Sequence, residues 1–202
     1  MLTVLGWVAA ACGSALSLPQ LVRILRAKTS AGLSLLLWQL LMAASIGWTH
    51  HGLLVTHRPN IWLPNLATAI TSALLVRFLA KDRGLRSTVW ILPLVLSGVL
   101  IGIDLTFGAL AYGIATSIPQ VIGAAAQLLD VIRSIDIAGV SVVFLGFSVV
   151  VQALWLIWGA LAGEVSVVVS ATCNGAVVLV TYLWYLLRRA GLLRAMPLGG
   201  TV

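Results

Sequence analysis

Two tryptophans and two asparagines lie at matching places in the two halves of this apolar chain. Trp48 pairs with Trp155, and Asn65 pairs with Asn174. An asparagine amide offers two donors and an acceptor, which suit the hydroxyls, amides or carboxylates of a small molecule. A tryptophan offers a broad apolar face that can stack on the C–H face of a sugar ring or on another flat solute. We therefore expect the four side chains to form a small polar pocket with aromatic walls.

Ser45 and Gln152 form a third matching pair. Each lies three residues before its tryptophan and so on nearly the same helix face. We expect both to line the same cavity. The alternative for all three pairs is helix packing, with polar side chains bonded to neighbouring helices and tryptophans as filler.

A proline–glutamine motif occurs twice. The segment CGSALSLPQ at Cys12–Gln20 returns as YGIATSIPQ at Tyr112–Gln120, 100 residues later. Pro19 and Pro119 fall inside apolar runs, where a proline removes a backbone hydrogen bond and clashes with the preceding turn. Each precedes a glutamine, Gln20 or Gln120. The pairing predicts two hinge or gate elements; a fixed packing kink is the alternative.

Asp130 is the candidate proton-coupling residue, because it follows the second proline–glutamine motif and such a group must be desolvated and re-exposed. The alternative is a solvated helix end paired with Arg133. We expect the other acidic residues and the histidines at helix ends, in loops or at the membrane interface (Asp82, Asp104, Asp136, Glu164, His50, His51 and His57). The sequence holds no pattern typical of an enzyme, a metal site or a cofactor site, so we expect none of these.

The composition is that of a helical membrane protein. Hydrophobic residues make up 61% of the 202 residues, charged residues only 8%, and the mean hydropathy is +1.11. The apolar runs are continuous rather than alternating, which favours helices over a β-barrel. We predict an all-α integral membrane protein with seven transmembrane helices, near residues 3–25, 31–56, 60–80, 88–105, 108–132, 137–162 and 165–187.

The basic residues predict the orientation. Eleven of the twelve fall on one side of this seven-helix layout, and only Arg58 falls on the other. The N-terminus is thus predicted outside and the C-terminus in the cytoplasm. Because the positive charges lie at helix ends rather than on one basic face, the net charge of +7 does not indicate nucleic-acid binding.

The repeated motifs divide the chain into two parallel three-helix repeats joined by a linker helix, a 3+1+3 layout. We place the first repeat at 1–80, the linker at 81–107, the second repeat at 108–187 and a basic cytoplasmic tail at 188–202. Parallel repeats are related by an axis along the membrane normal and bind solute at their interface. The small residues at 123–126 would permit close helix contacts within a protomer or in a homo-oligomer.

The two proline–glutamine motifs, each followed by a Gly-x-Ser segment (Gly32–Ser34 and Gly139–Ser141), resemble the PQ-loop superfamily. The layout is most similar to SWEET sugar transporters. The resemblance implies a plasma-membrane facilitator that carries a mono- or disaccharide by alternating access, with the asparagine and tryptophan pairs around the sugar. SWEETs also carry prolines at the start of the second helix of each repeat, which Leu35–Leu37 and Val142–Leu145 lack.

Other members of the superfamily suggest alternatives. Cystinosin-like proteins export amino acids with protons, using an aspartate near the second motif, a role that Asp130 could fill here. Receptors with the same fold bind ligands without transporting them. The partners implied in every case are a lipid bilayer and a small solute, with a sugar first.

Overall fold

The structure is a computed structural model that describes residues 1–27, 34–137 and 140–196, with residues 16–27 described for the backbone only. These residues form six α-helices: α1 (Leu2–Ala27), α2 (Leu35–His50), α3 (Pro59–Asp82), α4 (Ile91–Arg133), α5 (Val142–Ala162) and α6 (Val165–Arg189). A π-helix, η1 (His51–Val55), continues α2, and a 3-10 turn, η2 (Ser87–Trp90), leads into α4. The described residues contain no β-strand, which agrees with the predicted all-α class.

The serines of the two Gly-x-Ser segments cap α2 and α5. Ser34 and Ser141 are the N-cap residues, and their hydroxyls accept hydrogen bonds from the backbone N–H groups of Leu37 and Phe144. A serine at this position satisfies a donor that the first helical turn leaves free. The two helices therefore begin at Leu35 and Val142, later than the predicted 31 and 137.

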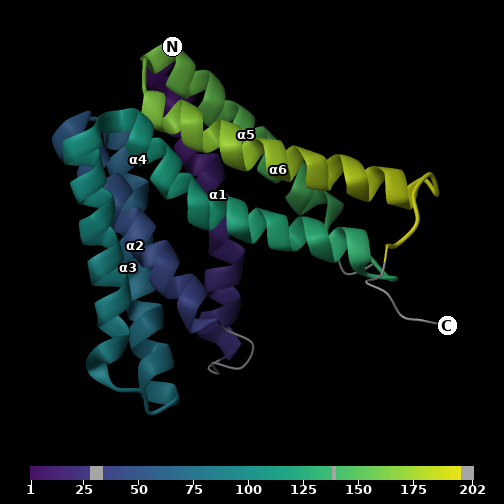
Figure 1. The fold of residues 1–202 in the computed structure, drawn as a ribbon, viewed down its shortest axis with the longest axis horizontal. Helices are drawn as coiled ribbons and strands as arrows, with labels where there is room; N and C mark the ends of the chain where they lie inside the picture. The colour runs from purple at the N-terminus through teal and green to yellow at the C-terminus, as the bar shows by residue number, and fades with distance from the viewer. Residues whose placement is uncertain (28–33, 138–139, 197–202) are drawn as a thin grey trace.

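The predicted break between the fourth and fifth helices lies at Gly108. Its backbone has φ 76° and ψ −176°, a conformation open to glycine and strained for other residues, inside the otherwise helical run of α4. Figure 1 shows α4 as two stretches that point in different directions. With η2, the run Ser87–Arg133 has 47 residues, more than twice the ~20 that span a bilayer.

The helices form two arms that diverge from the end where the N-terminus lies (Figure 1). One arm contains α2 and α3, which pack side by side; the other contains the second stretch of α4 with α5 and α6. Helix α1 packs against both α3 and α5.

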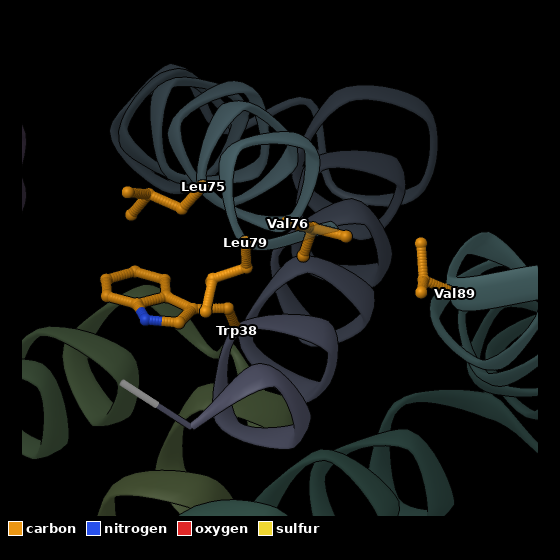
Figure 2. Close-up of a cluster of buried hydrophobic side chains, with 5 residues drawn as sticks. All are labelled: Trp38, Leu75, Val76, Leu79 and Val89. Carbon is orange, nitrogen blue, oxygen red and sulfur yellow. The ribbon is translucent and has the colours of Figure 1, made fainter. Parts of the chain in front are cut away.

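Each arm has its own apolar cluster, and a third cluster joins the arms. In the first arm, Trp38 packs with Leu75, Val76 and Leu79 of α3 and with Val89 of η2 (Figure 2). In the second arm, Val131, Leu145 and Tyr185 pack together. The third cluster consists of Ile61, Trp158 and Val167.

Four helical stretches of the described residues are long and apolar enough to cross a membrane: Pro59–Asp82, Ser87–Arg133, Val142–Ala162 and Val165–Arg189. The seven crossings, the 3+1+3 layout and the positions of the termini stay predictions.

Candidate functional site

A cavity of about 370 Å³ lies where the two arms meet, and all six helices contribute to its wall. Its volume falls within the range of small-molecule sites, roughly 300–1,000 Å³. None of the described residues that line it carries a charge. The polar part of the wall consists of neutral hydroxyl and amide groups and the indoles of two tryptophans.

Five of the six predicted solute-binding residues line this cavity: Ser45, Trp48, Asn65, Gln152 and Trp155. Helices α2, α3 and α5 supply them. The sequence pairs Ser45/Gln152 and Trp48/Trp155 thus meet around one space. Their predicted role in binding a solute stays a prediction.

Asn174 is the exception among the predicted residues. It is buried in α6 but is absent from the described lining of the cavity. It lies four residues after the lining residue Ser170, which puts it on the same helix face one turn further along. The two asparagines therefore do not occupy equivalent places around the cavity.

Ring contacts hold both tryptophans in place. Trp48 meets Tyr112 edge-on with ring centroids 5.1 Å apart and meets His51 edge-on at 5.6 Å. Trp155 meets Trp158 edge-on at 5.6 Å. Such edge-to-face contacts add about 0.5–1.5 kcal/mol beyond the burial of area, so the aromatic walls are preorganised.

Asn65 is partly engaged by its own helix. Its amide Nδ2 donates to the carbonyl of Ile61 at 2.8 Å, and one turn later the Thr68 hydroxyl donates to the carbonyl of Pro64 at 2.8 Å. Pro64 lies inside α3 and cannot donate to the preceding turn. The side chains around this proline thus supply local hydrogen bonds at the cavity wall.

The second proline–glutamine motif reaches the cavity through its glutamine. Gln120 lines the cavity and donates from Nε2 to the Thr116 carbonyl at 3.2 Å and to Ser170 Oγ of α6 at 3.3 Å. Pro119 lies inside α4. The side chains of Pro19 and Gln20 lie outside the described part of the chain, and the predicted hinge role of both motifs stays a prediction.

Asp130 lies far along α4, exposed and near the helix end at Arg133. It does not line the cavity, and no ion pair joins it to Arg133 in the described residues. Its role in proton coupling also stays a prediction.

The structure reveals a polar cluster that the sequence analysis missed. His51 is fully buried and Asp104 is 4% exposed; His51 Nδ1 lies 2.9 and 3.0 Å from the two carboxylate oxygens of Asp104. On the other side of the ring, His51 Nε2 lies 2.8 Å from Ser166 Oγ. Both residues lie near helix ends as expected, at the end of α2 and before the bend at Gly108, but their burial and their contact were not predicted.

One signal in the sequence could have located Asp104. Ser97, Leu100 and Asp104 follow the i, i+3, i+7 spacing of one helix face, and all three are buried. The opposite face, with Val99 and Leu105, is exposed. Asp104 was expected at a helix end, whereas its helix face determines its surroundings.

Arg58 and Glu164 form an ion pair near the C-terminal end of α5 and the N-terminal end of α6. Arg58 Nε donates to Glu164 Oε1 at 2.8 Å, and Arg58 also donates to the Ala162 carbonyl. Arg58 follows η1, whereas Glu164 is the residue before α6. The pair therefore connects the chain before α3 with the α5–α6 turn.

Two comparisons found similarity to known proteins. The family described as PQ loop repeat matches residues 1–49, which include the first proline–glutamine motif. A solved structure of a eukaryotic SWEET transporter superposes with a TM-score of 0.66 over 94% of this chain and 97% of that chain, at 15% sequence identity. The chain carries a PQ-loop repeat on a SWEET-like fold. With its several long apolar helices, the SWEET-like fold indicates a multi-pass membrane protein. No curated protein sequence matches.

Proposed function

We propose that this protein is an alternating-access membrane transporter of a small neutral polar solute, with a mono- or disaccharide as the first candidate. The observation that carries the proposal is the cavity, in which Trp48 and Trp155 provide aromatic walls and Ser45, Asn65 and Gln152 provide neutral hydrogen-bonding groups. Aromatic faces with neutral donors and acceptors suit the C–H faces and hydroxyls of a sugar.

The neutral wall also disfavours a charged solute. A carboxylate or ammonium group that enters a site without a charged partner loses its hydration and gains only neutral hydrogen bonds. Since the described lining residues are uncharged, an amino acid would be bound less well than a sugar. The similarity to a solved SWEET transporter supports transport rather than ligand sensing.

Alternating access requires the two arms to move relative to each other. The Arg58–Glu164 pair and the cluster of Ile61, Trp158 and Val167 would close one end of the solute path. Opening that end would break the ion pair while the divergent ends of the arms approach. The bend at Gly108 and the proline–glutamine motifs would take up part of this movement.

The test is uptake of labelled solutes by proteoliposomes at equal pH on both sides. The panel contains glucose, sucrose, trehalose, cystine, lysine and nicotinamide riboside. We expect uptake of at least one sugar, with a loss of at least tenfold in Asn65→Ala and in Trp155→Ala. Matched controls are Thr172→Ala and Trp7→Ala, because both residues are exposed on their helices.

Three results would contradict the proposal. Uptake of cystine or lysine alone would replace the sugar with an amino acid. Binding of a panel member without flux would support a receptor. Sugar uptake at the wild-type rate by both Asn65→Ala and Trp155→Ala would place the solute outside this cavity.

A further inference from the structure

The cluster of His51, Asp104 and Ser166 has a composition that is costly to bury. All three side chains are buried, and each comes from a different element: η1, α4 and α6. Ionisable groups inside a membrane protein are expensive and generally mark a pathway for ions, protons or substrate. The π-helix that begins at His51 is a second such sign, since π-bulges are frequent at functional sites.

The charge of the cluster depends on one proton. Among the described residues, Asp104 has no lysine or arginine partner; its ion-pair partners are His51 and, at 3.6 Å, His50. The His51–Asp104 pair is neutral overall when it holds one dissociable proton. That proton lies either on the imidazole, which is then a cation beside the carboxylate anion, or on the carboxylate, which is then neutral beside a neutral imidazole. Without that proton the buried pair has one uncompensated negative charge, which is costly in a medium of low polarity.

Ser166 can adapt to either state of the imidazole. When His51 is protonated on both nitrogens, Nε2 donates to Ser166 Oγ; when Nε2 is deprotonated, the Ser166 hydroxyl donates to it. The 2.8 Å separation serves both arrangements. The other groups that face the cluster are His50 Nδ1, which has no hydrogen-bond partner, and Tyr112, which stacks on His51 with ring centroids 4.7 Å apart.

Close helix packing fixes the position of Ser166. A Cβ atom added at Gly113 would lie 2.7 Å from the Ser166 carbonyl oxygen and 2.9 Å from its Cα. Only glycine permits α4 to approach the start of α6 so closely. The hydroxyl of Ser166 is therefore held against His51 by the backbones of two helices.

The cluster also adjoins the solute cavity. Trp48 is a wall of that cavity and contacts both His51 and Tyr112 through its ring. Ser166 lies one turn before the lining residue Ser170. Because His51 lies between α2 and α3 of the first arm and Ser166 lies in the first turn of α6, separation of the arms at this end would break their hydrogen bond and admit water to the pair.

We propose that His51, Asp104 and Ser166 form a proton-binding site whose occupancy is coupled to solute transport. The coupling rests on the proposed function; the proton site itself does not. The proton is bound while this end of the path is closed and exchanges with water when the arms separate. The carrier would then move one proton for each solute.

The first measurement tests the site without any solute. Infrared difference spectra between pH 5 and pH 8 are recorded for the protein in liposomes. We expect carboxyl and imidazole bands in the wild type that are lost in Asp104→Asn and reduced in His51→Gln. The control, Asp130→Asn, removes an exposed carboxylate of the same helix and leaves these bands in place. A wild-type spectrum equal to that of Asp104→Asn overturns the proposal.

The second measurement tests coupling with labelled glucose in the same liposomes. Exchange at equal pH reports transport itself, and accumulation under a pH difference reports coupling. We expect accumulation of up to about tenfold per pH unit in the wild type, because one pH unit corresponds to a factor of ten for one proton. Asp104→Asn exchanges glucose but accumulates none.

The outcomes separate the two proposals. Exchange without accumulation in the wild type overturns the coupling and leaves the transporter intact. Absence of exchange in the wild type overturns glucose transport, and the infrared bands then decide the proton site independently.

Discussion

His51 and Trp158 occupy corresponding positions, each three residues after a cavity tryptophan, yet their surroundings differ in kind. Trp48 and His51 meet at 5.6 Å and 89°, and Trp155 and Trp158 meet at 5.6 Å and 87°. Beyond these rings, His51 contacts a carboxylate and a hydroxyl, whereas Trp158 lies in an apolar cluster with Ile61.

This difference separates a fixed contact from a switchable one. An apolar cluster has no titratable group, so its packing does not depend on protonation, whereas the charge of the His51–Asp104 pair does. The same edge-to-face contact with a cavity tryptophan is thus combined with an apolar anchor in one half and with an ionisable group in the other. Three sets of substitutions test this comparison through stability.

Trp158→Ala should have the largest effect. Trp158 is 2% exposed, and truncation of a buried tryptophan typically costs about 3–5 kcal/mol. We expect the melting temperature in detergent, followed by circular dichroism, to fall by roughly 10 °C. Trp7→Ala is the control, since Trp7 is 43% exposed. Equal shifts for the two variants would show that the apolar cluster is not an anchor.

Asp104→Leu should have the second-largest effect on stability, because it leaves a buried histidine without its carboxylate partner. Removing one member of a buried pair costs about 3 kcal/mol or more, whereas replacing both members with apolar groups can be close to neutral. The double variant His51→Phe/Asp104→Leu should therefore regain much of the stability lost by the single variant. Additive losses in this double-mutant cycle would mean that the two side chains do not interact.

Ser34→Ala and Ser141→Ala should have the smallest effects, and these should be similar. Each removes one N-cap hydrogen bond of 3.2 Å, which is worth about 1 kcal/mol. The melting temperature should fall by only a few degrees in each variant. Because both caps are equivalent, unequal losses would show that the halves differ at their helix starts as well as at His51 and Trp158.

Much of the fold could be predicted from local signals. The apolar runs indicated where the helices lie, and the break expected between the helices at 88–105 and 108–132 coincides with the bend at Gly108, where a positive φ favours glycine. The starts of α2 and α5 were placed too early, although the Gly-x-Ser segments that contain their capping serines were recognised in the sequence. Hydropathy extends into the segment before a helix, whereas the cap fixes where hydrogen bonding begins.

The matching of the two halves predicted the place of some lining residues and failed for others. The tryptophan pair and the Ser45/Gln152 pair meet in the cavity as expected, whereas Asn174 is absent from its described lining. The His51 cluster has no counterpart, since position 158 holds a tryptophan. Asp104 and Ser166 lie 53 and 115 residues after His51 along the chain, so only the tertiary structure brings the three together.

The central claim is that solute passes between the two arms, through the end closed by Arg58 and Glu164. The most direct test replaces Arg58 and Glu164 with cysteines in a background with Cys12→Ser and Cys173→Ser, and links the two new thiols with a short reducible reagent. Solute flux is measured in proteoliposomes before linking, after linking and after reduction. The account predicts flux that stops on linking and returns on reduction, with no change in either single-cysteine control. Flux that continues through the linked protein would contradict it, because the solute would then cross by another path.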